Sequence, residues 1–376
     1  MKKFKKILKI LLIALLVLYI SGSVVAVQVI YGTLFHRVEA PDYSGYLCYS
    51  DIAADYPRRE VHFPSGEVQL TGWLYGEDND DGLVVMAHGL GSTAESYLHI
   101  TRWFVDRGYR VLTYDATGTG ASGGRDTRGL SQSVLDLDAA LDWVEADEAL
   151  DELPLLLFGH SWGGYAAARV LAYGHDVTAT VSVSAYDSPM GLMCETAGAY
   201  CGPAVYAGYP FLYLQQWIRF GSAANGSAAA AINDSEVPVL LVHGTADTTI
   251  SHDGAGLISR DFTGDNVTTL SLEGEDHMSL LRPQDAAYQD YLTEVNAVYA
   301  DLWAQYDGQI PDSLRAEYYA SVDKTITGGV NEELMEQIDA FYRAAAALPA
   351  ATHALPSNPV GRGHDPAACR HHRTIP

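Results

Sequence analysis

Short apolar runs alternate with longer stretches of helical periodicity through the middle of this chain. Apolar runs bounded by polar or glycine positions predict buried strands, and apolar residues spaced three and four apart predict helices. The expected strands are 83–87, 110–114, 155–158 and 178–184, and the expected helices are 94–107, 131–145 and 161–173. This alternation predicts an α/β fold with a mostly parallel sheet covered by helices on both faces.

The pattern changes on both sides of this region. Residues 60–75 have the two apolar runs and the intervening turn of an antiparallel hairpin. Residues 188–236 lack strand alternation and are rich in aromatic, methionine and alanine residues, which predicts an inserted cap. The core is then expected in two parts, 60–187 and 237–347, followed by a disordered tail at 348–376. Within the second part we expect strands at 237–242 and 266–272, a helix at 253–262, and C-terminal helices over 283–347, the last at 332–346.

The first 30 residues have a pattern of their own. Residues 7–30 are almost entirely apolar and long enough to cross a bilayer as a helix. The lysines at and before its start are Lys2, Lys3, Lys5, Lys6 and Lys9. Positive charge there predicts a cytoplasmic amino terminus, with a linker at 31–59 and the catalytic part outside the cytoplasm. Small residues at 21–26 also fit a cleaved signal peptide, which would release a secreted protein; we favour the uncleaved anchor.

Charge and cysteine content narrow the class of protein. The 376 residues carry a net charge of −24, and beyond the amino-terminal lysines 18 basic residues stand against 47 acidic ones. Such a surface repels nucleic acid, so we expect no nucleic-acid partner. The four cysteines fit an oxidising compartment, and of the three possible pairing schemes we expect one with a Cys194–Cys201 bridge. No cysteine has zinc-site spacing, and we expect neither a metal nor a cofactor.

The expected strand at 155–158 leads directly into Gly159-His160-Ser161-Trp162-Gly163, and a helical pattern follows. A G-x-S-x-G sequence by itself can be a simple glycine turn. Here it lies between a strand and a helix, which is the context of a nucleophile elbow. Gly159 and Gly163 permit a turn tight enough to strain and expose Ser161. We therefore expect Ser161 to be a nucleophile, with His160 supporting the elbow.

A serine nucleophile needs a histidine base and an acid that holds the base. Asp247 follows the expected strand 237–242, and His277 follows the strand 266–272, giving the chain order Ser161, Asp247, His277. Asp187, which follows the strand 178–184, is a rival for the acid. The alternative for His277 is a solvent-facing loop histidine.

An acyl-transfer site also needs two donors for the oxyanion. His88, Gly89 and Leu90 follow the strand 83–87, and glycines there let backbone N–H groups turn toward the elbow. We expect the N–H groups of Leu90 and Trp162 to be the donors, with His88 and Gly89 supporting the loop. A plain glycine turn into a helix is the alternative.

These motifs together resemble the α/β-hydrolase superfamily, close to its serine aminopeptidase-like, monoglyceride-lipase-like branch of bacterial esterases. The motifs that carry the resemblance are 88–92 (HGLGS), 114–122 (YDATGTGAS), 159–164 (GHSWGG), 243–247 (HGTAD) and 276–277 (DH), within about 60–281. The family usually has arginine where Thr117 stands, so an ionic tether of that loop is expected to be missing. The resemblance implies an acyl-enzyme mechanism through Ser161, His277 and Asp247.

The first hypothesis is therefore a membrane-anchored, extracytoplasmic serine hydrolase, a carboxylesterase or lipase-like enzyme for small or medium apolar esters. A peptidase that releases amino-terminal residues is the second hypothesis. A surface-displayed binding module without turnover is the third, because one fold serves many functions. The expected partners are a small-molecule ester or amide substrate and, through the amino-terminal helix, the lipid bilayer.

Overall fold

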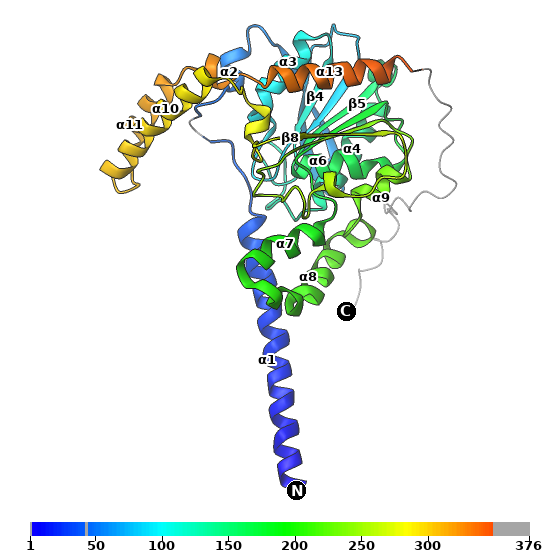
Figure 1. Ribbon diagram of the computed structural model, residues 1–376, viewed down its shortest axis with the longest axis vertical. Helices are drawn as coiled ribbons and strands as arrows, with labels where there is room; N and C mark the ends of the chain where they lie inside the picture. The colour runs from blue at the N-terminus through cyan, green and yellow to red at the C-terminus, as the bar shows by residue number, and fades with distance from the viewer. Residues whose placement is uncertain (1, 42–43, 349–376) are drawn as a thin grey trace, which may run out of the picture.

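The computed structural model describes residues 2–41 and 44–348. Its centre is an eight-stranded sheet in the spatial order β1-β2-β4-β3-β5-β6-β7-β8 (Figure 1). The hairpin β1–β2 is antiparallel, β2 pairs antiparallel with β4, and all other neighbours are parallel. The strands are β1 (Arg58–Ser65), β2 (Val68–Tyr75), β3 (Leu83–Ala87), β4 (Arg110–Asp115), β5 (Leu155–His160), β6 (Ala179–Val183), β7 (Val239–Gly244) and β8 (Val267–Leu272).

The central strands are buried because helices cover both faces of the sheet. Every residue of β3, β5, β6 and β7 is buried, and their apolar side chains divide between two clusters. One cluster includes α4 (Gln132–Glu145), α6 (Trp162–Arg169) and α9 (Ala228–Asn233). The other includes α3 (Leu98–Asp106) and α13 (Glu332–Ala346). The predicted α/β fold with a mostly parallel sheet is thus confirmed.

Three helices lie on the side of the body from which the amino terminus projects. The helix α1 (Lys2–Leu34) is a long rod, and α7 (Pro189–Cys201) and α8 (Val205–Phe220) lie beside its carboxyl-terminal half (Figure 1). α1 is the one helix of the described residues that is long and apolar enough to cross a membrane. The helices α7, α8 and α9 occupy the range expected for the cap.

The C-terminal range forms α10 (Ala286–Gln305), α11 (Asp312–Ser321), α12 (Lys324–Thr327) and α13. The pair α10 and α11 stands away from the sheet, whereas α13 lies along it (Figure 1). The remaining short helices are α2 (Tyr49–Ile52), α5 (Glu148–Asp151), and the 3₁₀ turns η1 (Ala94–Tyr97), η2 (Val170–Tyr173), η3 (Gly202–Ala204), η4 (Gly221–Ala223), η5 (Leu257–Ser259) and η6 (Ser279–Leu281). The expected disordered tail lies outside the described residues, apart from Leu348.

The helix expected at 253–262 does not form, and this prediction was wrong. The segment has only the turn η5. The carboxylate of Glu195, from α7, accepts hydrogen bonds from the backbone N–H groups of Ser251 (3.1 Å) and Ala255 (2.6 Å). Gly254 and Gly256 further disfavour a helix. A side chain distant in sequence therefore holds the backbone in a loop.

The Cys194–Cys201 bridge is also corrected, because Cys194 is a free thiol. Both residues belong to α7, two turns apart. Their separation along the helix axis is about 10 Å, beyond the Cα distance of about 4.4–6.8 Å that a disulfide requires.

The range 31–59, expected to be a linker, is packed on the body along part of its length. Tyr31 and Phe35 are buried in the same apolar cluster as α4 and α6. His36 and Val38 form bridges to Asp126 and Thr119. The aromatic side chains in this range account for the difference, because their burial holds the chain against the sheet domain.

Candidate active site

The elbow at Ser161 connects β5 to α6 through a strained turn. Ser161 has φ 58° and ψ −113°, a conformation that costs a residue with a side chain about 1–3 kcal/mol. A Cβ atom on Gly159 would lie 2.1 Å from the carbonyl oxygen of Gly163, and one on Gly163 would lie 2.0 Å from that of Ala87. Both flanking positions therefore require glycine, and the turn presents Ser161 at the carboxyl end of the strand.

The structure brings Ser161, His277 and Asp247 together, although they are distant in sequence. The Ser161 hydroxyl lies 2.9 Å from Nε2 of His277, and Nδ1 of His277 lies 2.7 Å from Oδ2 of Asp247. Since a carboxylate only accepts, Nδ1–H donates to Asp247, which leaves Nε2 free to accept the serine proton. This is the geometry of a nucleophile, base and orienting acid.

Asp247 is held as an anion by a complete set of donors. Its Oδ1 accepts the backbone N–H groups of Thr249 (2.8 Å) and Ile250 (2.9 Å). Its Oδ2 contacts His277 and also His243, whose Nε2 is 3.1 Å away. Burial opposes ionisation, but hydrogen bonds from His243 and His277 more than offset it and hold the pKa of Asp247 well below its usual range. The acid is ready to stabilise a histidine cation.

The loop after β3 is fixed from inside by His88. Its Nδ1 donates to the carbonyl oxygen of Gly89 (2.8 Å), and its Nε2 accepts the N–H of Ala116 (3.0 Å). Burial lowers the pKa of His88, so the ring stays neutral as these two bonds require. Leu90, one of the expected oxyanion donors, lies partly buried at the end of this loop.

Trp162, the other expected donor, is the first residue of α6. A backbone N–H in the first turn of a helix has no partner within that helix, so it is available to an oxyanion. The indole of Trp162 is buried and donates from Nε1 to the carbonyl oxygen of Leu130 (2.8 Å). That bond fixes the residue beside Ser161.

His160 connects the elbow to the segment that carries His277. The N–H of Gly89 donates to the hydroxyl of Tyr97 (3.1 Å), which lies 2.7 Å from Nδ1 of His160. Nε2 of His160 lies 2.9 Å from the carbonyl oxygen of His277 and donates to it. Burial, followed by the neighbouring His277, lowers the pKa of His160 to about 3, so the ring stays neutral. No sequence motif marks Tyr97, which is the central link.

The loop around Thr117, where the family usually has arginine, is tethered in two other ways. Thr117 donates from its backbone N–H (2.7 Å) and its hydroxyl (2.8 Å) to buried Asp136. The guanidinium of Arg37 donates to three carbonyl oxygens of the loop, those of Gly120 (2.6 Å), Ser122 (3.0 Å) and Gly124 (2.9 Å). An arginine from the segment after α1 thus contacts this loop.

Asp187, the rival acid, lies elsewhere. Its Oδ1 accepts the Ser227 hydroxyl (2.7 Å) and the N–H of Ala229 (3.0 Å), so it caps the start of α9. A cavity of about 220 Å³ is lined by residues that include Tyr97 and Met278 but none of Ser161, Asp247 and His277. The cavity therefore borders Tyr97 rather than the nucleophile Ser161.

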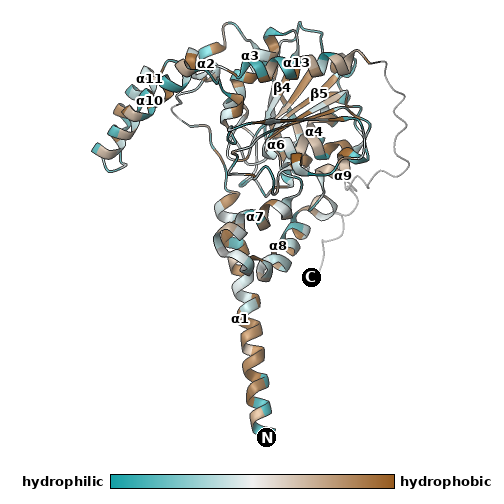
Figure 2. Ribbon diagram, in the orientation of Figure 1, coloured by the Kyte–Doolittle hydropathy of each residue, from teal (hydrophilic) through white to brown (hydrophobic). Residues whose placement is uncertain are grey.

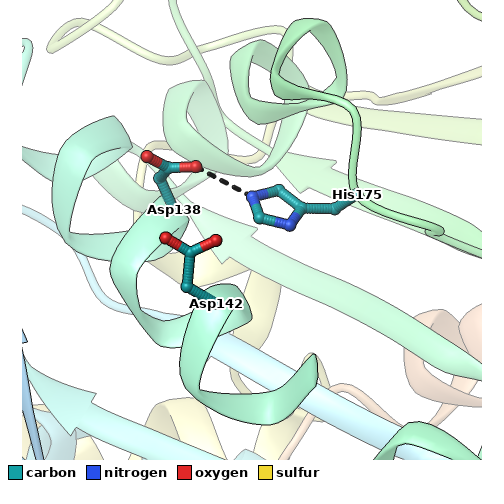
Figure 3. A group of neighbouring side chains, drawn as sticks. All are labelled: Asp138, Asp142 and His175. Carbon is teal, nitrogen blue, oxygen red and sulfur yellow. Dashed lines mark hydrogen bonds and ion pairs between the residues drawn. The ribbon is translucent and has the colours of Figure 1, made fainter. Parts of the chain in front are cut away.

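Asp138, Asp142 and His175 form a group with the residue types of a metal site (Figure 3). Nε2 of His175 lies 2.8 Å from Asp138, and its Nδ1 lies 2.6 Å from Glu145. Burial opposes a charged ring, but the hydrogen bonds that the ring donates to Asp138 and Glu145 prevail and raise the pKa of His175 to about 9. Both ring nitrogens therefore carry protons at neutral pH, and the buried ring forms ion pairs with partly exposed carboxylates rather than a ligand set.

Comparison with known proteins finds one family model and several relatives that match this chain. The model of a family described as serine aminopeptidase, S33, matches residues 78–192, which include His88 and Ser161. A monoacylglycerol lipase of Mycolicibacterium smegmatis is 27% identical over 264 residues, which cover 61% of this chain and 92% of the lipase. Polyketide transferases of a Penicillium species and of Aspergillus fumigatus are 27% and 30% identical over 136 and 131 residues. This chain spans less than half of those two relatives, 46% and 45%.

Among solved structures, an esterase of Pyrococcus furiosus aligns with a TM-score of 0.50 at 18% identity, covering 72% of this chain and 98% of the esterase. At that identity the likeness is one of fold. The chain has the α/β-hydrolase fold and is similar to the serine aminopeptidase, S33, family over residues 78–192 and to a monoacylglycerol lipase over most of the lipase's length.

Proposed function

We propose that this protein is a serine carboxylesterase of lipase-like kind that hydrolyses small or medium apolar esters. The observation that carries the proposal is the Ser161–His277–Asp247 geometry, with Oγ to Nε2 at 2.9 Å and Nδ1 to Oδ2 at 2.7 Å. A binding module needs no such hydrogen-bonded relay ending on a strained serine. The names of the monoacylglycerol lipase and the esterase among its relatives also favour ester substrates.

The reaction follows from the positions of the protons. Nε2 of His277 takes the Ser161 proton as Oγ attacks the ester carbonyl, and the Leu90 and Trp162 N–H groups stabilise the oxyanion. The imidazolium then gives its proton to the leaving alcohol, which leaves an acyl-Ser161 ester. Water, deprotonated by His277, attacks that ester and releases the acid. Asp247 remains ionised throughout, because its four donors stabilise the carboxylate.

The protein is further proposed to be anchored in the cell membrane by α1, with its body outside the cytoplasm. The helix has a hydrophilic start and a long hydrophobic middle (Figure 2). Lysines at the start favour the cytoplasm, and most of the apolar side chains of α1 are exposed, as lipid contact would require. Residues 188–236 are proposed to be the cap that selects the acyl group, with apolar side chains suited to an apolar substrate.

Labelling with a fluorophosphonate probe tests the catalytic proposal. The detergent-solubilised full chain is expected to be labelled, and Ser161→Ala is expected to abolish labelling. Ser321→Ala is the matched control, because that hydroxyl lies on α11 and bonds only its own helix. Labelling that persists in Ser161→Ala, or is absent from the folded wild type, would contradict the proposal.

The family description gives a second candidate, a peptidase that releases amino-terminal residues. Such an enzyme needs acidic groups that hold the substrate ammonium. Asp276, next to His277, instead accepts the N–H groups of Met278 (2.8 Å) and Ser279 (2.7 Å). We therefore favour ester hydrolysis. Comparing turnover of aryl esters with that of aminoacyl arylamides decides between the two, since a peptidase would turn over the arylamides.

A further inference from the structure

The hairpin formed by the end of α7 and by α8, residues 196–218, has no charged residue. Charged side chains stand at its borders, Glu195 before it and Arg219 after it. Large apolar and aromatic side chains of this hairpin are nevertheless exposed: Tyr200 (88%), Tyr206 (71%), Ile218 (66%), Trp217 (59%), Leu214 (51%), Tyr213 (46%) and Tyr209 (38%). A surface of this extent marks a contact with another apolar phase. Tyrosine and tryptophan are also the residues enriched at membrane interfaces.

The polar side chains between this hairpin and α1 are paired with each other. The Gln28 amide of α1 donates to Gln215 of α8 (3.1 Å). The hydroxyl of Tyr31 donates to Gln216 (2.5 Å), whose Nε2 donates to the carbonyl oxygen of Ala224 (3.3 Å). The Tyr19 hydroxyl donates to the carbonyl oxygen of Ala207. Internal pairing of this kind is what a hydrocarbon environment demands, because lipid chains offer no hydrogen bonds.

The contacts also fix the depth of the hairpin relative to α1. Tyr19 contacts Ala207 and Phe211 near the start of α8, and Gln28 contacts Gln215 farther along, so the two helices run in the same direction. A hydrocarbon span of about 20 residues that starts at Ile7 ends near Ala26. Tyr19 lies about 10 Å inside that limit at 1.5 Å per residue. The start of α8 lies at the same level.

We propose that the hairpin 196–218 is embedded in the outer leaflet of the bilayer beside α1, with the exposed side chains near the start of α8 in contact with lipid acyl chains and Trp217 at the level where the acyl chains meet the headgroups. The proposal rests on the anchoring of α1 proposed above and does not depend on the catalytic activity. Its occupant is lipid because the hairpin lies beside α1, most of whose apolar side chains are exposed as well (Figures 1 and 2). The protein would thus enter the membrane through two elements.

Tryptophan fluorescence provides the test. The full chain is reconstituted in nanodiscs whose lipids carry bromine on the acyl-chain carbons nearest the headgroup, the level proposed for Trp217, where the bromine quenches nearby indoles. Trp217, on α8, is 59% exposed, and Trp303, on α10, is 54% exposed. Trp217→Phe is expected to remove most of the quenching seen in the wild type. The matched variant Trp303→Phe is expected to retain it, because α10 projects sideways from the body, away from α7, α8 and the amino terminus (Figure 1).

Equal quenching in the wild type and in Trp217→Phe would overturn the proposal. So would a wild type that is not quenched and forms dimers, because a second copy would then cover the hairpin. Alkaline carbonate extraction of membranes separates this inference from the anchoring of α1. A chain that resists extraction while Trp217 is not quenched would retain the anchor and contradict the embedded hairpin. A chain that is extracted would contradict both.

Discussion

The Tyr97 hydroxyl lies 2.7 Å from Nδ1 of His160 and also accepts the N–H of Gly89, so a single side chain joins the loop after β3 to the elbow. The opposite nitrogen of His160 donates to the carbonyl oxygen of His277. Three separate loops at the carboxyl ends of the strands are thereby held in fixed positions relative to one another. This contact predicts that Tyr97 positions the catalytic groups without touching substrate.

Tyr97→Phe removes that hydroxyl and leaves Gly89 and His160 without their partner. We expect kcat for an aryl ester to fall about tenfold, equivalent to about 1.4 kcal/mol, with little change in KM, because the hydrogen bonds to Gly89 and His160 are both lost. The control is Tyr109→Phe, which loses a comparable bond to Asp339 on the helix α13, away from the site. A Tyr97→Phe enzyme with wild-type kcat would show that the contact is only structural.

The identity of the acid is tested by two matched variants. Asp247→Asn is expected to lower kcat by about 10³–10⁴, because the amide no longer holds His277 in the productive tautomer. Asp187→Asn is expected to keep kcat near the wild-type value, since Asp187 caps α9. Steady-state ester hydrolysis measures both, and the reverse ranking would assign the acid to Asp187.

The elbow requires glycine on steric grounds. Gly163→Ala would place a methyl group 2.0 Å from the carbonyl oxygen of Ala87. We expect the variant to lose fluorophosphonate labelling and to unfold at a lower temperature. Gly198→Ala is the control, because a Cβ at that helical position meets nothing within 4 Å. It should be neutral or slightly stabilising.

The pH dependence of stability is expected to include a contribution from His175. Its pKa is raised to about 9 by Asp138 and Glu145 after burial has been offset, against an ordinary value of 6.5. A raised folded-state pKa gives stability that is full below about pH 6.5 and is lost as the pH rises through 9.

His175→Gln removes that titration, so the difference in unfolding temperature between wild type and variant should shrink between pH 6.5 and 9. The contribution of this titration to the free energy of unfolding below pH 6.5 is on the order of 1–3 kcal/mol. Thermal unfolding of the detergent-solubilised chain measures the difference in unfolding temperature. A difference that stays constant between pH 6.5 and 9 would contradict the ion pairs of His175 with Asp138 and Glu145.

Arg37 is expected to stabilise the loop 115–124. Arg37→Met leaves the carbonyl oxygens of Gly120, Ser122 and Gly124 without their donor and should cost about 1–3 kcal/mol. Arg59→Met, which breaks an exposed pair with Glu77, should change stability by less than about 0.5 kcal/mol. Chemical unfolding compares the two, and equal effects would contradict a special role for Arg37.

Much of the fold follows from local patterns. The strand β3 begins and ends at the predicted residues, and α13 covers the predicted range, because apolar periodicity at these positions coincides with burial. Ser161, Asp247 and His277 were predicted to meet because each follows the carboxyl end of a strand in a parallel sheet. The structure brings them within hydrogen-bonding distance.

Local sequence patterns do not reveal the parts of the structure that depend on tertiary contacts. The loop at 253–262 depends on Glu195, far away in the chain, and nothing in the local sequence reports that contact. Arg37 and Tyr97 belong to no sequence motif. Their contacts join residues that are distant in sequence, and such contacts leave no periodic pattern. Phe35, directly after α1, is buried because its aromatic side chain packs in the apolar cluster of the body, and no local strand pattern predicts this burial.

The burial of Val27, Tyr31 and Phe35 in the body's own apolar cluster joins α1 and the body into one mechanical unit. A flexible tether would let the body tumble above the bilayer and sample every orientation. Here α1 is packed against the body, so the proposed anchoring would hold Ser161 at a constant height and angle over the membrane. Cleavage between α1 and the body would also remove Val27 and Tyr31 from the apolar core.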